Sequence, residues 1–121
     1  MRPMRLYTFD ASAGRAIANY GSVGLTVTHI LHAEGEAQTV AMWLAPGGSV
    51  GRHEADCGQL FLVTQGAGWV EGGDGARREI HAGQAAWWNA GEAHASGSET
   101  GMAALVIEGN ALDVSRLRPL E

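Results

Sequence analysis

The chain has 121 residues, of which 45% are hydrophobic and 17% charged, and its net charge is −5. This length and balance predict one globular domain over 1–121. Basic residues cluster no further than the pair Arg77–Arg78, which argues against a nucleic-acid partner. We also expect no membrane span, no signal peptide and, with Cys57 alone, no intrachain disulfide, which makes the cytoplasm the expected location.

The first residues in chain order form a short N-terminal segment, 1–23, ahead of a body over about 24–109 and a tail over 110–121. Eighteen glycines, about twice the usual share, separate short apolar or alternating runs along the body. This pattern is typical of short strands joined by tight turns, and no segment has the period of an amphipathic helix. We therefore predict an all-β fold, a single barrel or sandwich. The expected strands are 5–9, 25–31, 39–45, 59–65, 68–72, 76–81, 84–89, 94–98 and 102–109, followed by one possible helical turn in the tail.

The run 59–65 is apolar on both of its faces. In an extended strand, Gln59, Phe61 and Val63 point one way while Leu60 and Leu62 point the other. A strand buried on both faces needs a second layer, which is either another sheet of the chain or another subunit. We favour the subunit and predict a homodimer.

Two groups of residues have a distinctive spacing. In the first, Gly47 is followed by His53, Ala55, Gln59 and Gly66; in the second, Gly83 is followed by Asn89, Gly91, His94 and Ser98. Sixteen residues separate Gly66 from Gly83. This spacing resembles the two motifs of the cupin superfamily. The resemblance implies a small single-domain jelly-roll barrel, or double-stranded β-helix, with a pocket inside.

The resemblance also implies a metal site at four positions, which are His53, Ala55, Gln59 and His94 here. Ala55 has no donor atom, and the Gln59 amide stands where the family has a carboxylate. We predict a weakly held divalent ion, Zn, Ni, Cu, Fe or Mn, bound by His53, Gln59 and His94. The missing carboxylate would weaken Mn and Fe binding most. The alternative is that both histidines are hydrogen-bonded pocket residues without a metal.

Strand alternation suggests the remaining pocket residues. Ala55 would leave room for a ligand, Cys57 would share the face of His53, and Phe61 and Trp43 would form the wall. One of Trp87 and Trp88 should point inward. Glu54 and Asp56 should point to solvent. Glu92 follows the turn at Gly91, which leaves its direction open, although such turn residues are usually solvated.

Three classes of function remain open for such a pocket. An apolar cavity with two imidazoles and an amide suits a small organic ligand with one polar end. The protein would be a metal-dependent oxygenase, isomerase or lyase, a non-catalytic binding or sensor module, or a metal-free isomerase or epimerase with a histidine base. We expect a metal-binding small-molecule cupin and leave its reaction open.

Overall fold

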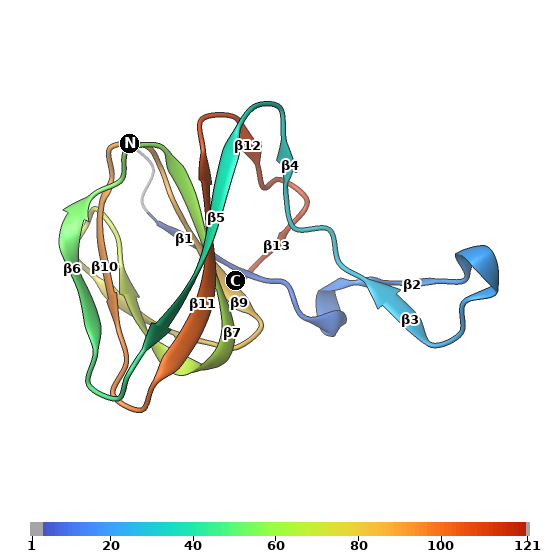
Figure 1. Ribbon diagram of the computed structural model, residues 1–121, viewed down its shortest axis with the longest axis horizontal. Coiled ribbons are helices and arrows are strands. Elements are labelled where there is room, and N and C mark those ends of the chain that lie inside the picture. Colours follow the sequence, from blue (N-terminus) through green and yellow to red (C-terminus); the bar gives the residue numbers. More distant parts are fainter. Residues whose placement is uncertain (1–3, 121) are drawn as a thin grey trace.

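The structure, a computed structural model, describes residues 4–120 and is built almost entirely of strands (Figure 1). The strands are β1 (Arg5–Thr8), β2 (Arg15–Ile17), β3 (Leu25–Val27), β4 (His32–Ala33), β5 (Ala37–Leu44), β6 (Ser49–Glu54), β7 (Gly58–Glu71), β8 (Arg77–His81), β9 (Gln84–Trp88), β10 (Ala93–Gly97), β11 (Met102–Gly109), β12 (Leu112–Asp113) and β13 (Arg118–Pro119). Two 3-10 turns, η1 (Ala11–Ala13) and η2 (Asn19–Gly21), complete the described part. No described helix is long and apolar enough to cross a membrane.

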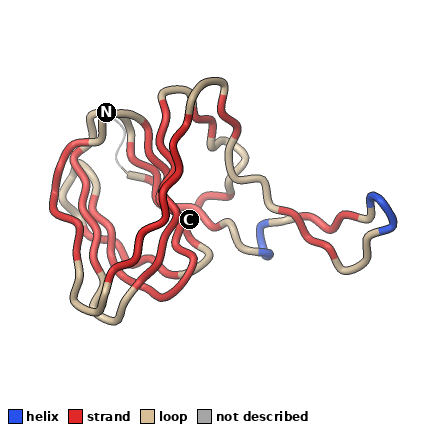
Figure 2. The backbone as a smooth tube through the Cα atoms, in the orientation of Figure 1, coloured by secondary structure: helices blue, strands red, loops and turns tan. Residues whose placement is uncertain are grey.

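The long strand β7 joins the two sides of the barrel. Its first half pairs with β9 and β11, and its second half pairs with β8 and β10. β5 and β1 extend the first side, while β6 extends the second. The two curved sides enclose one interior, as Figure 2 shows. This arrangement confirms the predicted all-β jelly-roll barrel.

The alternation predicted for 59–65 is present in β7. Phe61 and Val63 lie in the cluster that fills the barrel, together with Trp88 and Val106. Leu60 and Leu62 lie in a second cluster outside it, which is completed by Tyr7, Ala85, Trp87, Val114 and Leu117. The second layer is therefore the chain's own terminal segments. The homodimer stays a prediction, but the two-faced strand on which it rested has an intrachain explanation.

Several predicted elements differ from the observed ones. Gly66 was expected to separate two strands, yet it lies inside β7 with φ +77°, paired with Met102 of β11 and close to a register shift at Thr64. β6 was not predicted as a separate strand, and the expected strand 25–31 is reduced to β3. The tail forms β12 and β13 instead of a helical turn, and both β1 and β13 join the main sheet outside the expected body.

A hairpin arm, residues 15–27, projects away from the barrel (Figure 1). It consists of β2 and β3, which pair with each other, and of η2 at its tip. Tyr20 and Val23 near the tip have relative exposures of 102% and 96%.

Candidate functional site

The two motif histidines lie side by side on neighbouring strands. His53 of β6 and His94 of β10 are directly opposite in the antiparallel register. Side chains at such positions meet on one face of a sheet, and their ring centroids are 4.4 Å apart. His94 is buried, whereas His53 is exposed. The structure thus brings together two predicted ligands that are 41 positions apart in the sequence.

Backbone carbonyls determine the tautomer of both rings. Nδ1 of His53 is 2.7 Å from the carbonyl oxygen of Gly51, and Nδ1 of His94 is 3.1 Å from that of Glu92. Because a carbonyl oxygen only accepts hydrogen bonds, each Nδ1 carries the proton and donates it. In the neutral rings each Nε2 therefore keeps its lone pair, as a metal ligand or a base requires.

His94 is held in its neutral form. Burial lowers its pKa below the usual 6.5, and the neighbouring His53 lowers it further, while the hydrogen bond to Glu92 partly opposes the shift. One ring face stacks on Trp88 at a centroid distance of 4.4 Å. The ring is thus an uncharged base or ligand at neutral pH.

A row of polar side chains faces the histidines from the other side of the barrel. Gln59 of β7 lies between Trp88 of β9 and Glu108 of β11 in the strand register. Nε2 of Gln59 donates to Oε2 of Glu108 at 3.0 Å. A carboxylate cannot donate, so the amide nitrogen must face Glu108, and the amide oxygen Oε1 has no partner among the described residues.

Glu108 is the site residue that the sequence analysis missed. In the strand 102–109 it has the same parity as Met102, Ala104 and Val106, which all lie in the barrel core. The alternation was therefore sufficient to place this carboxylate inside. It was overlooked because it lies outside both motifs.

The histidines and the polar row border one small cavity of about 80 Å³. Its lining consists of His53, Glu54, Ala55, Asp56, Cys57, Gln59, His94 and Glu108. A wider depression of about 470 Å³ adjoins it and shares Cys57 and Glu108 as lining residues. The small cavity can hold a polar group of a ligand while the depression holds its body.

The two acidic residues of this stretch are exposed, as strand alternation predicted. Glu54 and Asp56 nevertheless border the cavity, because β6 ends at Glu54 and the chain turns before β7 begins. Ala55 and Cys57 line it as predicted. Burial and the nearby carboxylates raise the pKa of the Cys57 thiol, so this side chain stays protonated at neutral pH.

Neither residue of the predicted aromatic wall borders the small cavity. Phe61 does not line the cavity; it lies behind Trp88, with ring centroids 5.5 Å apart. Trp43 is 75% exposed, since its register opposite Ala103 places it on the outer face of β5. Trp88 points inward and Trp87 outward, as alternation requires.

The turn that precedes His94 is built on a buried carboxylate. Glu92, expected in solvent, is 1% exposed and accepts hydrogen bonds from the backbone N–H of Gly73 at 2.8 Å and of Asn89 at 3.0 Å. Its own carbonyl oxygen accepts from Ala55 N–H and from the His94 ring. Glu92 thus fixes the backbone on which both motifs meet.

The side chains around the cavity determine whether a metal ion could be coordinated there. Among residues 4–120, no three His, Cys, Asp or Glu side chains are grouped closely enough to hold an ion. The cavity lining brings two imidazoles and the Gln59 amide together as nitrogen and oxygen donors. Such a set suits a divalent ion that prefers imidazole and keeps open coordination positions.

Known proteins resemble this chain in sequence and in fold. The (R)-mandelonitrile lyase of Granulicella tundricola is 38% identical over 65 residues, which are 52% of this chain and 50% of that protein. The chain therefore matches about half the length of this curated relative.

Solved structures share the barrel. A cupin superfamily protein of Desulfitobacterium hafniense superposes with a TM-score of 0.58 at 20% identity, covering 67% of this chain and 76% of that one. An RmlC-like cupin of Shewanella frigidimarina gives a TM-score of 0.57 at 22% identity, covering 72% of each chain. These likenesses show the fold.

The family is established by a match to more than half of the chain. The family described as AraC-like ligand binding domain matches residues 37–111, which contain both histidines, Gln59 and Glu108. The chain therefore belongs to the AraC-like ligand binding domain family and has the fold of the cupin structures it resembles.

Proposed function

We propose that this protein binds a divalent metal ion and a small, uncharged organic molecule in the cavity between His53, Gln59 and His94. One observation carries the proposal. Two imidazoles, each of which donates Nδ1–H to a carbonyl and so leaves Nε2 for a ligand, border a cavity that the half-buried Glu108 also lines, with the exposed residues Glu54 and Asp56 at its rim. A cavity with this charge favours a cation.

Nε2 of His53, Nε2 of His94 and Oε1 of Gln59 would hold the ion. The carbonyls of Gly51 and Glu92 orient the two rings, as outer partners do in metal sites. Zn²⁺, Ni²⁺ and Cu²⁺ suit this set better than Mn²⁺ or Fe²⁺. A bound ion would supply Lewis-acid polarisation of a ligand oxygen.

The same charges restrict the ligand. A carboxylate ligand would be repelled by the half-buried Glu108 and by the negative charges of Glu54 and Asp56 at the rim, whereas a neutral hydroxyl or carbonyl group would not. Ala55 leaves space beside His53 for that group, and the adjoining depression can take the rest of the molecule. We therefore infer a small neutral alcohol or carbonyl compound as the ligand class.

The chemistry available to such a ligand is proton transfer. In a chain without a bound ion, Nε2 of His94 is free, and the neutral ring can accept a hydroxyl proton there. The oxygen then forms a carbonyl while a neighbouring carbon–carbon bond breaks, and its electron pair departs with the leaving group. The name of the Granulicella relative, a lyase acting on mandelonitrile, favours this reaction class. The family description favours the second candidate, a ligand-binding module without turnover.

Calorimetric titration of Zn²⁺, Ni²⁺ and Mn²⁺ into untagged, chelator-treated protein tests the metal. We expect one ion per chain, with affinity at least about 10-fold lower in His53→Ala and in His94→Ala. His81→Ala is the matched control, because His81 is an exposed imidazole at the end of β8. The proposal is contradicted if the unmodified protein binds no metal. It is also contradicted if the His53, His94 and His81 variants all lose metal affinity to the same extent.

Thermal stabilisation and turnover assays test the ligand. Neutral hydroxynitriles and hydroxyketones should raise the melting temperature more than the matched hydroxy acids do. Product formation that is lost in His94→Ala supports a lyase, and stabilisation without product supports the binding module. Stronger stabilisation by the acids rejects the ligand class.

A further inference from the structure

The hairpin arm, residues 15–27, carries three of the large hydrophobic side chains that are exposed in the described chain. Its two strands hydrogen-bond to each other and to no other strand. Tyr20, Val23 and Leu25 are exposed to 102%, 96% and 40%. An isolated two-stranded hairpin is only marginally stable in water, so a further contact is needed to hold this arm.

The tip of the arm holds Tyr20 in a costly conformation. Tyr20 has φ +63° and ψ +21°, and it is the only non-glycine residue with positive φ in residues 4–120. This left-handed conformation is unfavourable for a bulky residue. Strain that places an aromatic ring fully in solvent is expected where the ring makes a contact with another molecule.

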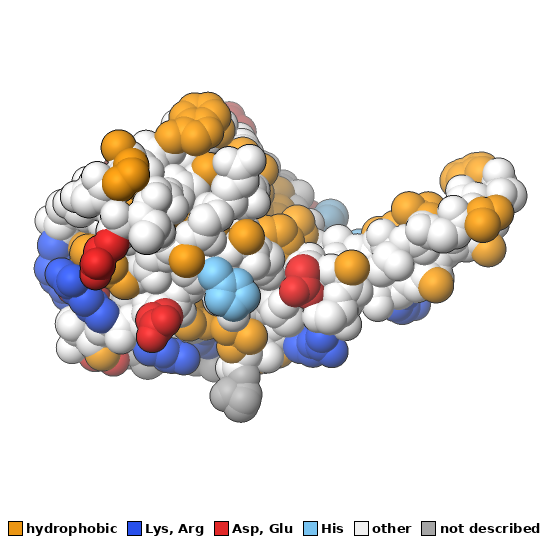
Figure 3. All heavy atoms as spheres, turned by 90° about the horizontal axis from the view of Figure 1, so that it is seen from below, with side chains coloured by type: hydrophobic (Ala, Val, Ile, Leu, Met, Phe, Trp, Pro, Cys, Tyr) orange, Lys and Arg blue, Asp and Glu red, His pale blue; other side chains and the backbone are white. Residues whose placement is uncertain are grey.

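β5 offers a complementary surface on the barrel. It pairs only with β11, which leaves one edge of its eight residues open. Exposed edges are normally protected by charges, prolines or bulges. β5 has no such protection, and the stretch 37–51 contains no Asp, Glu, Lys or Arg. The arm stretch 16–31 also lacks these residues, and Figure 3 shows the arm covered mainly by hydrophobic and uncharged side chains.

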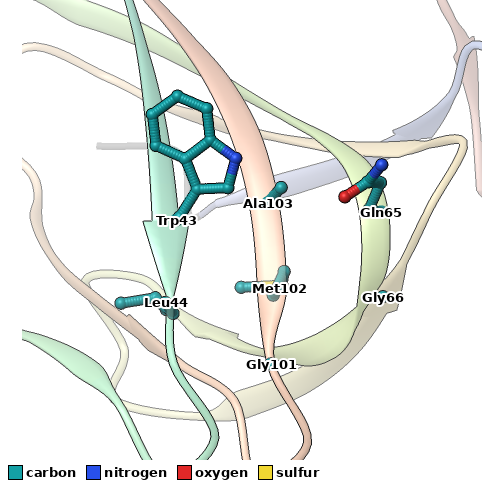
Figure 4. Close-up of a pocket in the computed structure, with 7 residues that line it drawn as sticks. All are labelled: Trp43, Leu44, Gln65, Gly66, Gly101, Met102 and Ala103. Atoms are coloured by element: carbon teal, nitrogen blue, oxygen red, sulfur yellow. The ribbon is translucent and has the colours of Figure 1, made fainter.

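A notch on the outer face of β5 has the shape to take a side chain. Trp43 and Gln65 rise on either side of Ala103 in Figure 4, so a methyl group forms the floor between two larger side chains. The notch has a volume of about 340 Å³, and Leu44, Gly66, Gly101 and Met102 complete its lining. An aromatic ring fits over Ala103 beside the indole, with the Gln65 amide available to its hydroxyl.

We propose that the arm of one copy lies against β5 of a second copy, with Tyr20 seated in the notch of Trp43, Gln65 and Ala103. A two-fold axis makes the contact reciprocal, so both apolar surfaces of each chain are covered. The 13 residues of the arm and the eight of β5 supply 21 residues per protomer, and a stable interface uses about 20–30 a side. Buried Tyr and Trp are the residues that dominate such interfaces.

Light scattering on the full chain tests the assembly. We expect a mass of twice the 12.7 kDa of one chain. The measurement is made at a protein concentration of about 100 µM, because association depends on concentration. Tyr20→Asp and Trp43→Asp should each raise the dimer dissociation constant about 30-fold or more. His81→Asp, on the exposed face of β8, is the control and should leave it unchanged.

The Tyr20→Gly variant distinguishes loss of the contact made by the Tyr20 ring from loss of the turn conformation at this position. Glycine adopts positive φ without cost, so the hairpin keeps its shape while the ring is lost. The variant should dissociate like Tyr20→Asp, with an unchanged circular dichroism spectrum. An unmodified chain that stays monomeric, or a dimer that tolerates the Tyr20 and Trp43 variants, overturns the proposal.

Cross-linking tests the docking partner directly. In a Cys57→Ser background, a chain with Tyr20→Cys and a chain with Gln65→Cys are mixed and oxidised. We expect a disulfide between the two chains and far less of it when His81→Cys replaces Gln65→Cys. Equal yields in both mixtures contradict the proposed seat of Tyr20.

Discussion

At the scale of residues, the hydrogen bonds of two imidazoles determine what the cavity can bind. His53 and His94 each donate Nδ1–H to a carbonyl, so their accepting nitrogens are free for a ligand. Burial against Trp88 keeps the inner ring uncharged. The site is therefore ready for a cation or a transferable proton at neutral pH.

Burial of His94 makes stability depend on pH. Its folded pKa lies below the unfolded value of 6.5, so the unfolded chain binds more protons between these two values. Stability is thus complete above about pH 6.5 and falls as the pH drops below it. Urea unfolding in the presence of chelator measures the free energy of unfolding at about pH 5 and about pH 8. The difference between these two free energies should be smaller for His94→Asn than for the unmodified chain. Equal pH dependence in both proteins contradicts this assignment.

Glu108 should strengthen metal binding without being a ligand. Its carboxylate holds the Gln59 amide by a hydrogen bond and adds a negative charge beside the cavity. Loss of an outer partner typically costs about 10-fold or more in metal affinity. Calorimetry should show this loss for Glu108→Gln, while Glu79→Gln on the exposed face of β8 binds metal normally. Equal affinity in both variants would remove Glu108 from the site.

The sequence predicted the histidines, Gln59, Ala55 and Cys57 correctly as neighbours, because the motif spacing carries that information. It misplaced Glu92, since a turn residue is usually solvated and only the folded backbone provides the N–H groups that hold its carboxylate. Alternation placed Glu54 and Asp56 in solvent, where they are, but it did not show that both border the cavity. Residue patterns describe straight strands, and this cavity lies where a strand ends.

At the scale of elements, β7 makes the barrel by crossing from one side to the other. The crossing brings Gly68 against Gly97 of β10 so closely that a Cβ on Gly68 would collide with the Gly97 carbonyl oxygen. Such glycines are also turn signals, and this is why the sequence predicted two strands in place of one. The distinction requires knowledge of the partner strands, which the local pattern does not contain.

Gly68→Ala tests this close approach. The added methyl group must displace backbone, so we expect a loss of about 2 kcal/mol or more in the free energy of unfolding. Gly35→Ala is the control, because nothing lies within 4 Å of its added Cβ and its φ is not positive. Denaturant titration of both variants measures the difference, and similar stability in the two would show that the strands can separate there.

At the scale of the whole molecule, the two terminal segments complete the fold. Val114 and Leu117 of the tail cover the outer face of β7, which would otherwise expose Leu60 and Leu62. Glycine spacing and strand length were enough to predict the fold class. They were not enough to identify this cover, because short irregular segments have no period that marks a buried face.

Leu117→Ala tests the role of the tail. Leu117 is 3% exposed, and truncating a buried leucine costs about 2–5 kcal/mol. Arg116→Ala, an exposed neighbour, should change stability by no more than about 0.5 kcal/mol. Thermal or urea unfolding compares the two. A negligible effect of Leu117→Ala would mean that the tail is dispensable for the barrel.

The central claim is that His53 and His94 hold a metal ion together. Anomalous diffraction from crystals of the untagged protein, grown with Zn²⁺ or Ni²⁺, tests it most directly. We predict one strong peak between the Nε2 atoms of the two histidines, at about 2.0–2.1 Å from each for Zn²⁺. A fully soaked crystal without a peak there, or with metal only at exposed histidines such as His81, would contradict the claim.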